Sequence, residues 1–531
     1  MVKLDSSSLD WALRSIKEIG DNDLFPRSFE IDVIESQWSR IKSELLAKEF
    51  VFDRHRLNKE KKYHWIGGRR AIVPKGNLSY RFATQLDPID SIVLTSLIYQ
   101  YGNIIENSRI NVNENKVFSY RFKPLGYYLY DTEVNWVRFW EISKEKAEQH
   151  EGYVLECDIS DFYNQIYHHT LENELQKAGV PKEICSAIKD LMMTLTHGVS
   201  RGIPVGPVAV HLLGEVTLNS IDNSLKSHFY NYCRYIDDFH IYCRSKEEAD
   251  IALYNLVNFL DINGRLVPQR YKISLIEHTE FIKKAEQKLT DAQLDEVESD
   301  IIKTILTHSS GDPYRTIFFT DLNEEEKKNF TQEAMTKLLK ESLEIGDVDF
   351  IKIRWLLRRF SQIGMPGAIS FLLRNMENLT PALAEVAMYL ISTIDQFEGE
   401  WANIGSQLLK AMEIPLIKRC EYLQMILVNL FSKNPDLNHI EKILEKFPRT
   451  TSMVQRKIIL VATKANFDHW LREKKYELDR YETWTKRAII MGASIFPEDE
   501  KKFWLNRIIR DPKYTLLEKS VAEWVKQGGI I

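Results

Sequence analysis

Apolar residues in the first 300 positions alternate between two spacings along the chain. Strand-like stretches with Gly and Pro breaks or alternating apolar positions are found at 66–82, 152–160 and 232–243, the last of which predicts a hairpin. Spacing of three to four, typical of amphipathic helices, is found at residues 9–20, 33–50, 87–107, 171–179, 181–196, 211–227 and 247–264. This mixture predicts an α+β fold for the first half of the chain.

The second half of the chain has a different pattern. Residues 306–315 break the periodicity and predict a linker, and from about residue 325 to residue 531 nearly every segment is an amphipathic helix bounded by a short break. Such alternation is typical of stacked helix pairs, and an irregular helical bundle is the alternative. We therefore predict three parts: residues 1–305, a linker at 306–324, and a helical-repeat domain at 325–531.

Composition and charge exclude several classes of protein. The net charge of −5 does not by itself predict a nucleic-acid partner, although residues 54–75 form a basic stretch with interleaved aromatic residues that could bind phosphates. No apolar run is long enough for a membrane span, and the N-terminus lacks the apolar core of a signal peptide. The five cysteines form no Cys-x-x-Cys pair, which fits reduced thiols in a cytoplasmic protein.

Two adjacent acids lie at the centre of the predicted hairpin. Asp237 and Asp238 follow Tyr235 and Ile236, so like charges stand together where strands meet. A polar turn is one explanation, and neutralisation by a bound cation is the other. Asp158 ends the strand at 152–160, and pairing of that strand beside the hairpin would bring Asp158 and Asp237 together.

Three segments in this order closely resemble motifs of reverse transcriptases. They are CDISDFYNQIYHHTLENEL, RGIPVGPVAVHLLGEVTL and RYIDDFHIYC, the last with the Y-x-D-D pattern. The likeness is greatest to the prokaryotic, defence-associated abortive-infection (Abi-type, "unknown group") branch. That resemblance implies a fingers and palm polymerase core followed by an all-α helical-repeat (HEAT-like) domain, and a role in antiviral defence.

The resemblance also implies roles for individual residues. Asp158, Asp237 and Asp238 are expected to be catalytic and, with the carbonyl of Ile159, to bind Mg²⁺ or Mn²⁺. Substrate binding is implied for Lys75, Arg81, Asp161, Phe162, Tyr163, Pro204, Gly206 and Lys272.

Within this substrate set, Lys75 and Arg81 resemble the cations that bind the β- and γ-phosphates, with Arg69 or Arg70 as substitutes. Tyr163 occupies the position of the aromatic gate that excludes a 2′-hydroxyl, and a core aromatic residue is the alternative. Lys272 resembles a lysine that protonates the leaving pyrophosphate.

One position departs from the pattern of templated reverse transcriptases. Many of them have Gln after the motif-B proline, whereas Val205 stands between Pro204 and Gly206 here. The resemblance therefore leaves three hypotheses open: a template-independent polymerase that extends DNA from one of its own tyrosines, an enzyme that copies a partner non-coding RNA, and a non-catalytic nucleotide- or RNA-sensing scaffold. The expected partners are dNTPs, the DNA product, RNA in the second case, and further copies of the chain in a homo-oligomer.

Overall fold

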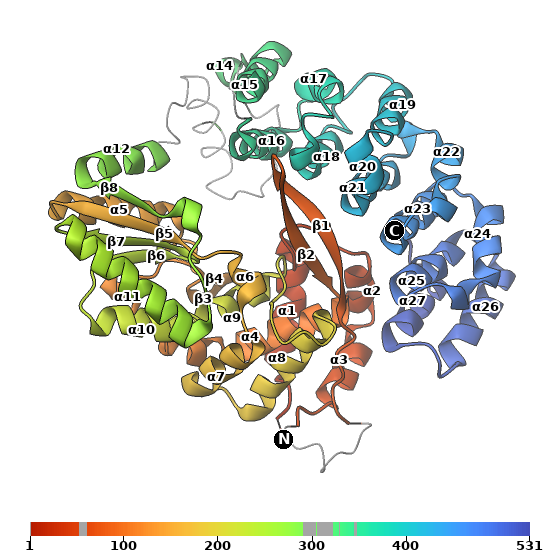
Figure 1. Cartoon of the computed structure of the whole chain (residues 1–531). Coiled ribbons are helices and arrows are strands. Elements are labelled where there is room, and N and C mark those ends of the chain that lie inside the picture. The colour runs from red at the N-terminus through yellow and green to blue at the C-terminus, as the bar shows by residue number, and fades with distance from the viewer. Residues whose placement is uncertain (1, 52–60, 290–303, 305–321, 329, 345–347) are drawn as a thin grey trace. The chain divides into compact units, whose positions relative to one another are not determined.

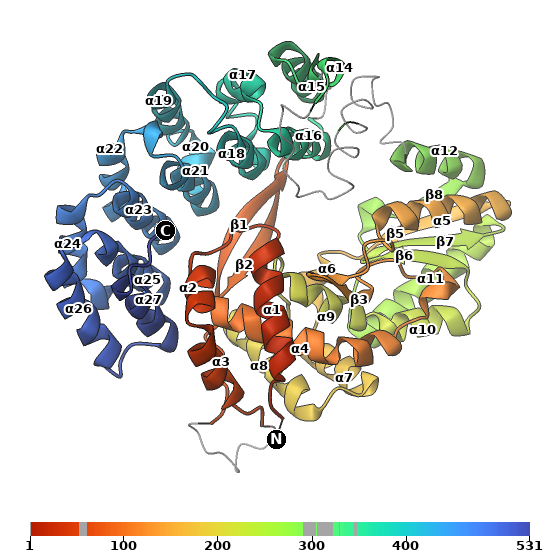
Figure 2. The same cartoon turned by 180° about the vertical axis from the view of Figure 1, so that it is seen from behind.

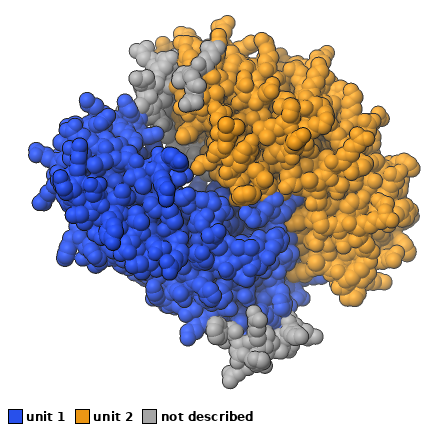
Figure 3. Space-filling model, viewed as in Figure 1, with its two compact units in different colours: residues 1–70, 83–293 blue, residues 71–82, 294–531 orange. Residues whose placement is uncertain are grey.

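The computed structural model describes residues 2–51, 61–289, 304, 322–328, 330–344 and 348–531, so most of the predicted linker lies outside the described residues. The chain divides into two compact units (Figure 3). Unit 1 comprises residues 1–70 and 83–293, and unit 2 comprises residues 71–82 and 294–531. The division differs from simple chain order, because a short segment from the first half is grouped with the helical second half.

Unit 1 mixes helices and strands, as the patterning predicts. Its helices are α1 (Ser6–Ile19), α2 (Glu30–Ser36), α3 (Trp38–Leu46), α4 (Pro88–Asn107), α5 (Trp136–Gln149), α6 (Phe162–Gln165), α7 (His168–Ala178), α8 (Lys182–Leu195), α9 (His211–Val216), α10 (Asn219–Ser227), α11 (Lys246–Gly264) and α12 (His278–Leu289). Its strands are β3 (Phe122–Leu125), β4 (Tyr128–Tyr130), β5 (Tyr153–Asp158), β6 (Tyr232–Tyr235), β7 (Asp238–Cys243) and β8 (Ser274–Glu277). The helix predicted at 211–227 is two helices, α9 and α10, and the helix predicted at 33–50 ends at Leu46 after an interruption at Gln37.

Local chemistry explains where the best-predicted helices begin and end. Asp87 accepts a hydrogen bond from the backbone N–H of Ile89, and Pro88 occupies the first turn of α4, where its missing N–H is not needed. Ser245 caps α11 in the same way through the N–H of Glu248, and Arg265 ends that helix in the left-handed conformation. These capping residues define the helix limits that the sequence predicted.

The strands that carry the candidate acids form an antiparallel sheet in the order β6-β7-β5-β8. Helices α5 and α12 cover one face, and α10 and α11 lie on the other (Figure 1). A hydrophobic cluster joins the sheet to α5 and α12, with Phe139, Trp140, Val154, Cys233, Tyr242 and Phe281 among its members. Because helices cover both faces, β5 and β7 are buried along most of their lengths.

A long hairpin contributes to both units. Strands β1 (Gly68–Gly76) and β2 (Ser79–Leu86) pair with each other, which confirms the strand prediction near residues 66–82. The base of the hairpin belongs to unit 1, where Arg69 donates to Gln85 Oε1 at 2.8 and 3.0 Å. Residues 71–82 belong to unit 2.

Beyond its hairpin segment, the described part of unit 2 is helical. It contains α14 (Glu324–Lys328), α15 (Gln332–Glu344), α16 (Phe350–Ile363), α17 (Ile369–Arg374), α18 (Leu383–Ser392), α19 (Trp401–Ala411), α20 (Pro415–Arg419), α21 (Glu421–Lys433), α22 (Ile440–Leu444), α23 (Ser452–Lys464), α24 (Asp468–Tyr476), α25 (Thr483–Gly492), α26 (Glu498–Arg510) and α27 (Leu516–Lys526). Helices α16, α18, α21, α23, α25 and α27 each pack against the next one, and the view from behind in Figure 2 shows the same succession. Across the residues described here, no helix has both the length and the apolar character needed to cross a membrane.

Candidate active site

The predicted carboxylates meet where β5 ends beside the β6–β7 turn. The strand register places Asp238 opposite Asp158, and the backbone N–H of Ile159 donates to the carbonyl of Asp237 at 3.2 Å. The sequence predicted that Asp158 and Asp237 would face each other across the strands. Instead Asp238 is the cross-strand partner of Asp158, and Asp237 lies in the turn. Ile236 and Asp237 form the two-residue loop between β6 and β7, so the first paired residue of β7 is Asp238.

Lys272 forms an ion pair with the buried carboxylate of Asp158. Lys272 Nζ donates to Asp158 Oδ2 at 2.6 Å, although the lysine side chain itself is 58% exposed. Partial burial lowers the pKa of Lys272, but the hydrogen bond and charge of Asp158 outweigh this effect and raise the pKa overall. The prediction that Lys272 lies at the site is therefore supported by its contact with a candidate catalytic residue.

The carboxylate of Asp238 is affected by two other negative charges. Loss of surrounding water, followed by the negative charges of Asp237 and Asp158, raises the pKa of Asp238 to about 7. Its carboxyl group can share a hydrogen bond with Asp158 when it is protonated. Like charges are held together here, which costs free energy unless a positive charge joins them.

The donor chemistry of this corner fits a hard divalent cation. Carboxylate and carbonyl oxygens are the ligands that Mg²⁺ and Mn²⁺ prefer, and Asp158, Asp237, Asp238 and the carbonyl of Ile159 supply only these. Within the described ranges, no three Cys, His, Asp or Glu side chains are already arranged as a set of metal ligands. Lys272 is paired with Asp158 Oδ2, an oxygen that a bound cation would otherwise use.

The turn that carries Asp237 is held by buried polar groups. Ile236 has φ +57°, a left-handed conformation that β-branched residues rarely adopt. Its N–H donates to Ser119 Oγ at 2.8 Å, and its carbonyl accepts from Arg234 Nη1 at 2.8 Å. Ser119 Oγ in turn donates to Glu215 Oε1 at 2.6 Å, and Arg234 also pairs with Glu215. Strain at this turn is thus balanced by hydrogen bonds from outside it.

Three consecutive residues that follow β5 closely are predicted to bind the nucleotide. Asp161 has φ +49° at the start of α6 and accepts from Asn164 Nδ2 at 2.7 Å. Phe162 is buried and packs edge-on against the ring of Tyr163, with centroids 5.5 Å apart. Tyr163 is half-buried, and burial raises the pKa of its phenol, so the hydroxyl keeps its proton. The roles of these residues toward substrate stay predictions.

The loop with Pro204 and Gly206 packs against a segment near the N-terminus. Gly206 has φ +117°, and a Cβ there would come within 2.8 Å of Asn22 Oδ1. Asn22 Nδ2 also donates to the carbonyl of Thr84 at 2.7 Å, and Pro204 is buried. Glycine is required at position 206 because both the backbone conformation and the close approach exclude a side chain.

Lys75 and Arg81 lie on the part of the hairpin that belongs to unit 2. The carbonyl of Lys75 accepts from Arg354 Nη2 at 2.8 Å, and the Lys75 side chain is exposed. The charge of Arg81 acts on Tyr422, whose pKa is raised by burial. Phosphate binding by Lys75 and Arg81 stays a prediction.

The basic stretch at 54–75 is only partly described, and its aromatic residues are engaged in packing. Tyr63 is buried and donates to Asp90 Oδ1 at 2.6 Å, and Trp65 Nε1 donates to the carbonyl of Ala187 at 2.8 Å. Phosphate binding by this stretch stays a prediction.

Sequence reasoning missed the residues that orient the site from a distance. Ser119 and Glu215 hold the acidic turn, and His211 and Asp23 continue a hydrogen-bond chain from Tyr163. The one available signal was a histidine four residues after the glycine- and proline-rich motif at 202–207. Nothing in the local pattern distinguishes Ser119 or Asp23 from ordinary loop residues.

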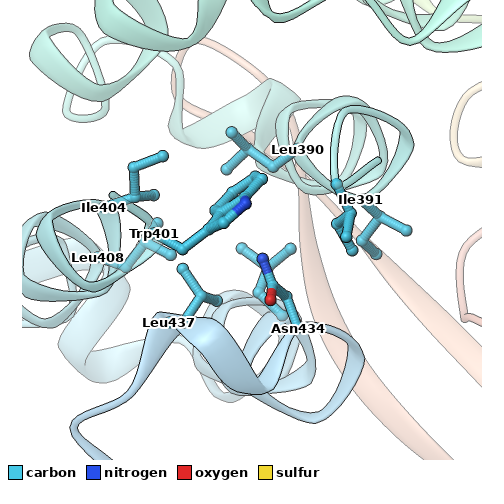
Figure 4. Close-up of a pocket in the computed structure, with 9 residues that line it drawn as sticks. Leu390, Ile391, Trp401, Ile404, Leu408, Asn434 and Leu437 are labelled. Carbon is cyan, nitrogen blue, oxygen red and sulfur yellow. The ribbon is translucent and has the colours of Figure 1, made fainter. Parts of the chain in front are cut away.

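A separate small hollow lies inside unit 2 (Figure 4). Eight apolar side chains and Asn434 line it, and its open space of about 10 Å³ suits a single water molecule. Asn434 Nδ2 has no hydrogen-bond partner among the described residues, which such a water would satisfy. The hollow contains no titratable group and is not a candidate for catalysis.

Comparison with known proteins identifies the fold of the site. Residues 73–282 match the family model described as reverse transcriptase (RNA-dependent DNA polymerase). No curated protein matches the chain. The solved structures with some likeness include telomerase from Candida albicans in complex with a TWJ fragment of telomeric RNA, at 10% identity, covering 78% of this chain and 70% of that chain, with a TM-score of 0.31. Apo telomerase from Candida tropicalis is also 10% identical, covering 77% and 73%, with a TM-score of 0.30. At TM-scores this low, the likeness has no bearing on function.

Proposed function

We propose that the protein is a nucleotidyltransferase, a DNA polymerase that adds dNTPs to a 3′-hydroxyl, because residues 73–282 match the reverse transcriptase family model. The observation that carries this proposal is the cross-strand pairing of Asp158 with Asp238 beside the turn that holds Asp237, where the charges of Asp237 and Asp158 help to raise the pKa of Asp238. Like charges at such a corner favour divalent cations, and two such ions are the usual requirement for in-line phosphoryl transfer.

The reaction needs little from the protein beyond binding and orientation. The 3′-hydroxyl loses its proton to water and its oxygen forms a bond to the α-phosphorus, while the bond from that phosphorus to the bridging oxygen breaks and pyrophosphate leaves. Mg²⁺ or Mn²⁺ held by the three acids and the Ile159 carbonyl would supply the positive charge that this transfer requires. Lys75 and Arg81 would bind the β- and γ-phosphates, and Lys272 would give a proton to the pyrophosphate after leaving Asp158.

Other residues would shape the nucleotide pocket. Asp161, Phe162, Pro204 and Gly206 form its walls in this proposal. Tyr163 would exclude the 2′-hydroxyl of a ribonucleotide by contact with the sugar. Their positions next to the end of β5 and to the loop at 201–208 support these roles.

The test uses the full chain, Mg²⁺ and labelled dNTPs, once with a poly(rA)/oligo(dT) duplex and once without nucleic acid. Wild-type protein should form polymer, and Asp237→Ala should reduce the rate by at least about 1,000-fold, as expected when charge stabilisation of the transition state is lost. Asp261→Ala is the matched control, because this exposed carboxylate on α11 pairs only with Arg265, one turn away, among the residues that the structure describes. Equal activity in wild type and Asp237→Ala would refute the assignment of the site.

We further propose that synthesis is template-independent and begins on a tyrosine of the protein, as part of antiviral defence in the cytoplasm. The apolar side chain of Val205, which cannot hydrogen-bond a template base, supports this choice over an RNA-templated enzyme. Mass spectrometry combined with nuclease digestion tests it, since DNase-sensitive material on a tyrosine is expected. A co-purifying RNA that synthesis requires would instead favour the templated enzyme, and dNTP binding without incorporation would favour a sensing scaffold.

For unit 2 we propose a HEAT-like helical repeat that supports a homo-oligomer. The packing of α16, α18, α21, α23, α25 and α27 each against the next supports this, because repeat proteins are held by contacts between neighbours. Light scattering of the full chain should give a mass above that of one chain, and a monomer at micromolar concentration would contradict the proposal.

A further inference from the structure

The hydroxyl of Tyr163 is one end of a chain of polar side chains. It lies 2.9 Å from His211 Nδ1, and His211 Nε2 lies 3.3 Å from Asp23 Oδ2. The three residues come from the start of α6, the start of α9 and the loop after α1, and all belong to unit 1. Contact between segments this far apart in sequence is a property of the fold and not of local pattern.

The direction of the hydrogen bonds follows from the acid at the far end. An ionised Asp23 can only accept, so Nε2 of a neutral His211 carries the proton and donates to Oδ2. Nδ1 then has a lone pair, and the hydroxyl of Tyr163 donates to it. Asp23 therefore selects the histidine tautomer that can accept from the tyrosine.

His211 is itself held in place. Its ring stacks on that of Tyr120 with centroids 4.0 Å apart and an angle of 4° between planes, and its side chain is 11% exposed. On the neighbouring turn of α9, a Cβ on Gly214 would approach both Cζ and the hydroxyl oxygen of Tyr163 to 3.4 Å. The tyrosine ring is thus bounded by a hydrogen bond at its tip and by helix backbone beside it.

We infer that His211 and Asp23 are positioning residues that set the preference of the enzyme for deoxynucleotides over ribonucleotides by fixing the ring of Tyr163. The inference rests on the proposed polymerase function. A ring can exclude a 2′-hydroxyl only if it cannot swing aside, since an oxygen atom needs little additional space. The hydrogen bond to His211 restrains that swing, and Asp23 keeps His211 in the orientation that makes it.

The experiment compares dUTP with UTP, which differ only in the 2′-hydroxyl, as substrates of the full chain under the conditions given above. His211→Phe keeps an aromatic ring against Tyr120 but removes both nitrogen atoms, and Tyr163→Phe keeps the gate ring but removes its hydroxyl. In each variant the dUTP:UTP ratio of kcat/KM should fall about 2- to 10-fold, the effect expected for the loss of one hydrogen bond. The change should arise from a lower KM for UTP, and in His211→Phe kcat for dUTP should alter less than about 2-fold.

Two further variants separate positioning from general loss of structure. Asp23→Ala should lower the ratio in the same direction, whereas Asp23→Asn, which retains an acceptor oxygen, should stay close to wild type. The double variant His211→Phe with Tyr163→Phe should be no worse than either single variant, because both remove the same hydrogen bond.

The outcomes separate this inference from the proposed function. Wild-type polymerisation with an unchanged ratio in His211→Phe and Asp23→Ala, or additive losses in the double variant, would overturn the inference alone. No incorporation by wild-type protein would refute the polymerase instead. In that case calorimetric Kd values for dUTP and UTP decide the inference, since the preference in binding should fall in His211→Phe and an unchanged preference would overturn it.

Discussion

The turn that presents Asp237 should depend on a single buried hydroxyl. Ile236 is held at φ +57° by a hydrogen bond from its N–H to Ser119 Oγ and by one from Arg234 to its carbonyl. A β-branched residue in this conformation costs about 1–3 kcal/mol, which the surrounding contacts must offset. Ser119→Ala removes one of these two restraints and leaves the strand pairs untouched.

The expected loss of stability in Ser119→Ala follows from the polar groups that lose their hydrogen-bond partner. Ser119 and Glu215 are fully buried, so the change deprives the N–H of Ile236 of its acceptor and Glu215 Oε1 of a donor. A buried polar group without a partner costs about 1–3 kcal/mol. Arg109 and Arg234 both donate to Glu215 Oε2 and not to Oε1, so the cost falls on Glu215 as well as on Ile236. This cost is of the same order as the strain, so the turn should relax and move Asp237.

Two measurements on the full chain test the prediction. Urea unfolding followed by tryptophan fluorescence should show a loss of about 1–3 kcal/mol, and the polymerisation assay should show kcat lowered more than about 10-fold with a nearly unchanged KM. Ser143→Ala is the matched control, because Ser143 is equally buried and its hydroxyl contacts His240 Nδ1 at 3.0 Å, away from the turn. This control should lose similar stability but keep its kcat.

The reasoning would be refuted by either of two results. Ser119→Ala could lose stability and retain full kcat, which would show that the position of Asp237 does not depend on this hydroxyl. Alternatively, the two serine variants could lose kcat to the same extent, which would show that the assay reports stability alone.

Three more predictions follow from buried or paired charges. Lys272→Met should tighten Mn²⁺ binding up to about 5-fold in calorimetry, because it removes the ammonium that competes for Asp158 Oδ2 at a partly exposed pair; weaker binding would contradict this competition. Burial lowers the pKa of His240 to about 3, so the unfolded chain binds the extra proton first and stability is lost as the pH falls from about 6.5 toward 3. The unfolding midpoint of His240→Phe, measured relative to that of wild type, should therefore be higher at pH 5 than at pH 7.5. The same difference at both pH values would exclude protonation of His240 as the cause. Burial and the charge of Asp87 raise the pKa of Asp90 to about 8, so the folded state holds a proton that the unfolded state releases near pH 4, and stability declines as the pH rises between these values. In Asp90→Asn, the thermal unfolding midpoint should fall less than in wild type between pH 5.5 and 8.5. An unchanged fall would show that other groups cause it.

The sequence by itself determined the elements whose causes are local. The strand at 152–160, the hairpin at 232–243 and the helix at 87–107 are where alternation, periodicity and capping predicted them. The acidic residues were recognisable for the same reason, since Asp237 and Asp238 interrupt an apolar hairpin. The order of the motifs was enough to predict a reverse transcriptase domain, which the family model at 73–282 confirms.

Only the tertiary structure decided how these pieces meet. The register that places Asp238 opposite Asp158, the pairing of Lys272 with Asp158, and the hydrogen-bond chain from Tyr163 through His211 to Asp23 all join segments distant in sequence. Secondary structure depends largely on interactions between residues close together in the sequence, and these produce recognisable sequence patterns. Contacts between distant segments depend on how complete surfaces pack, and a serine or aspartate in a loop has the same local preferences whether it orients a catalytic turn or faces water.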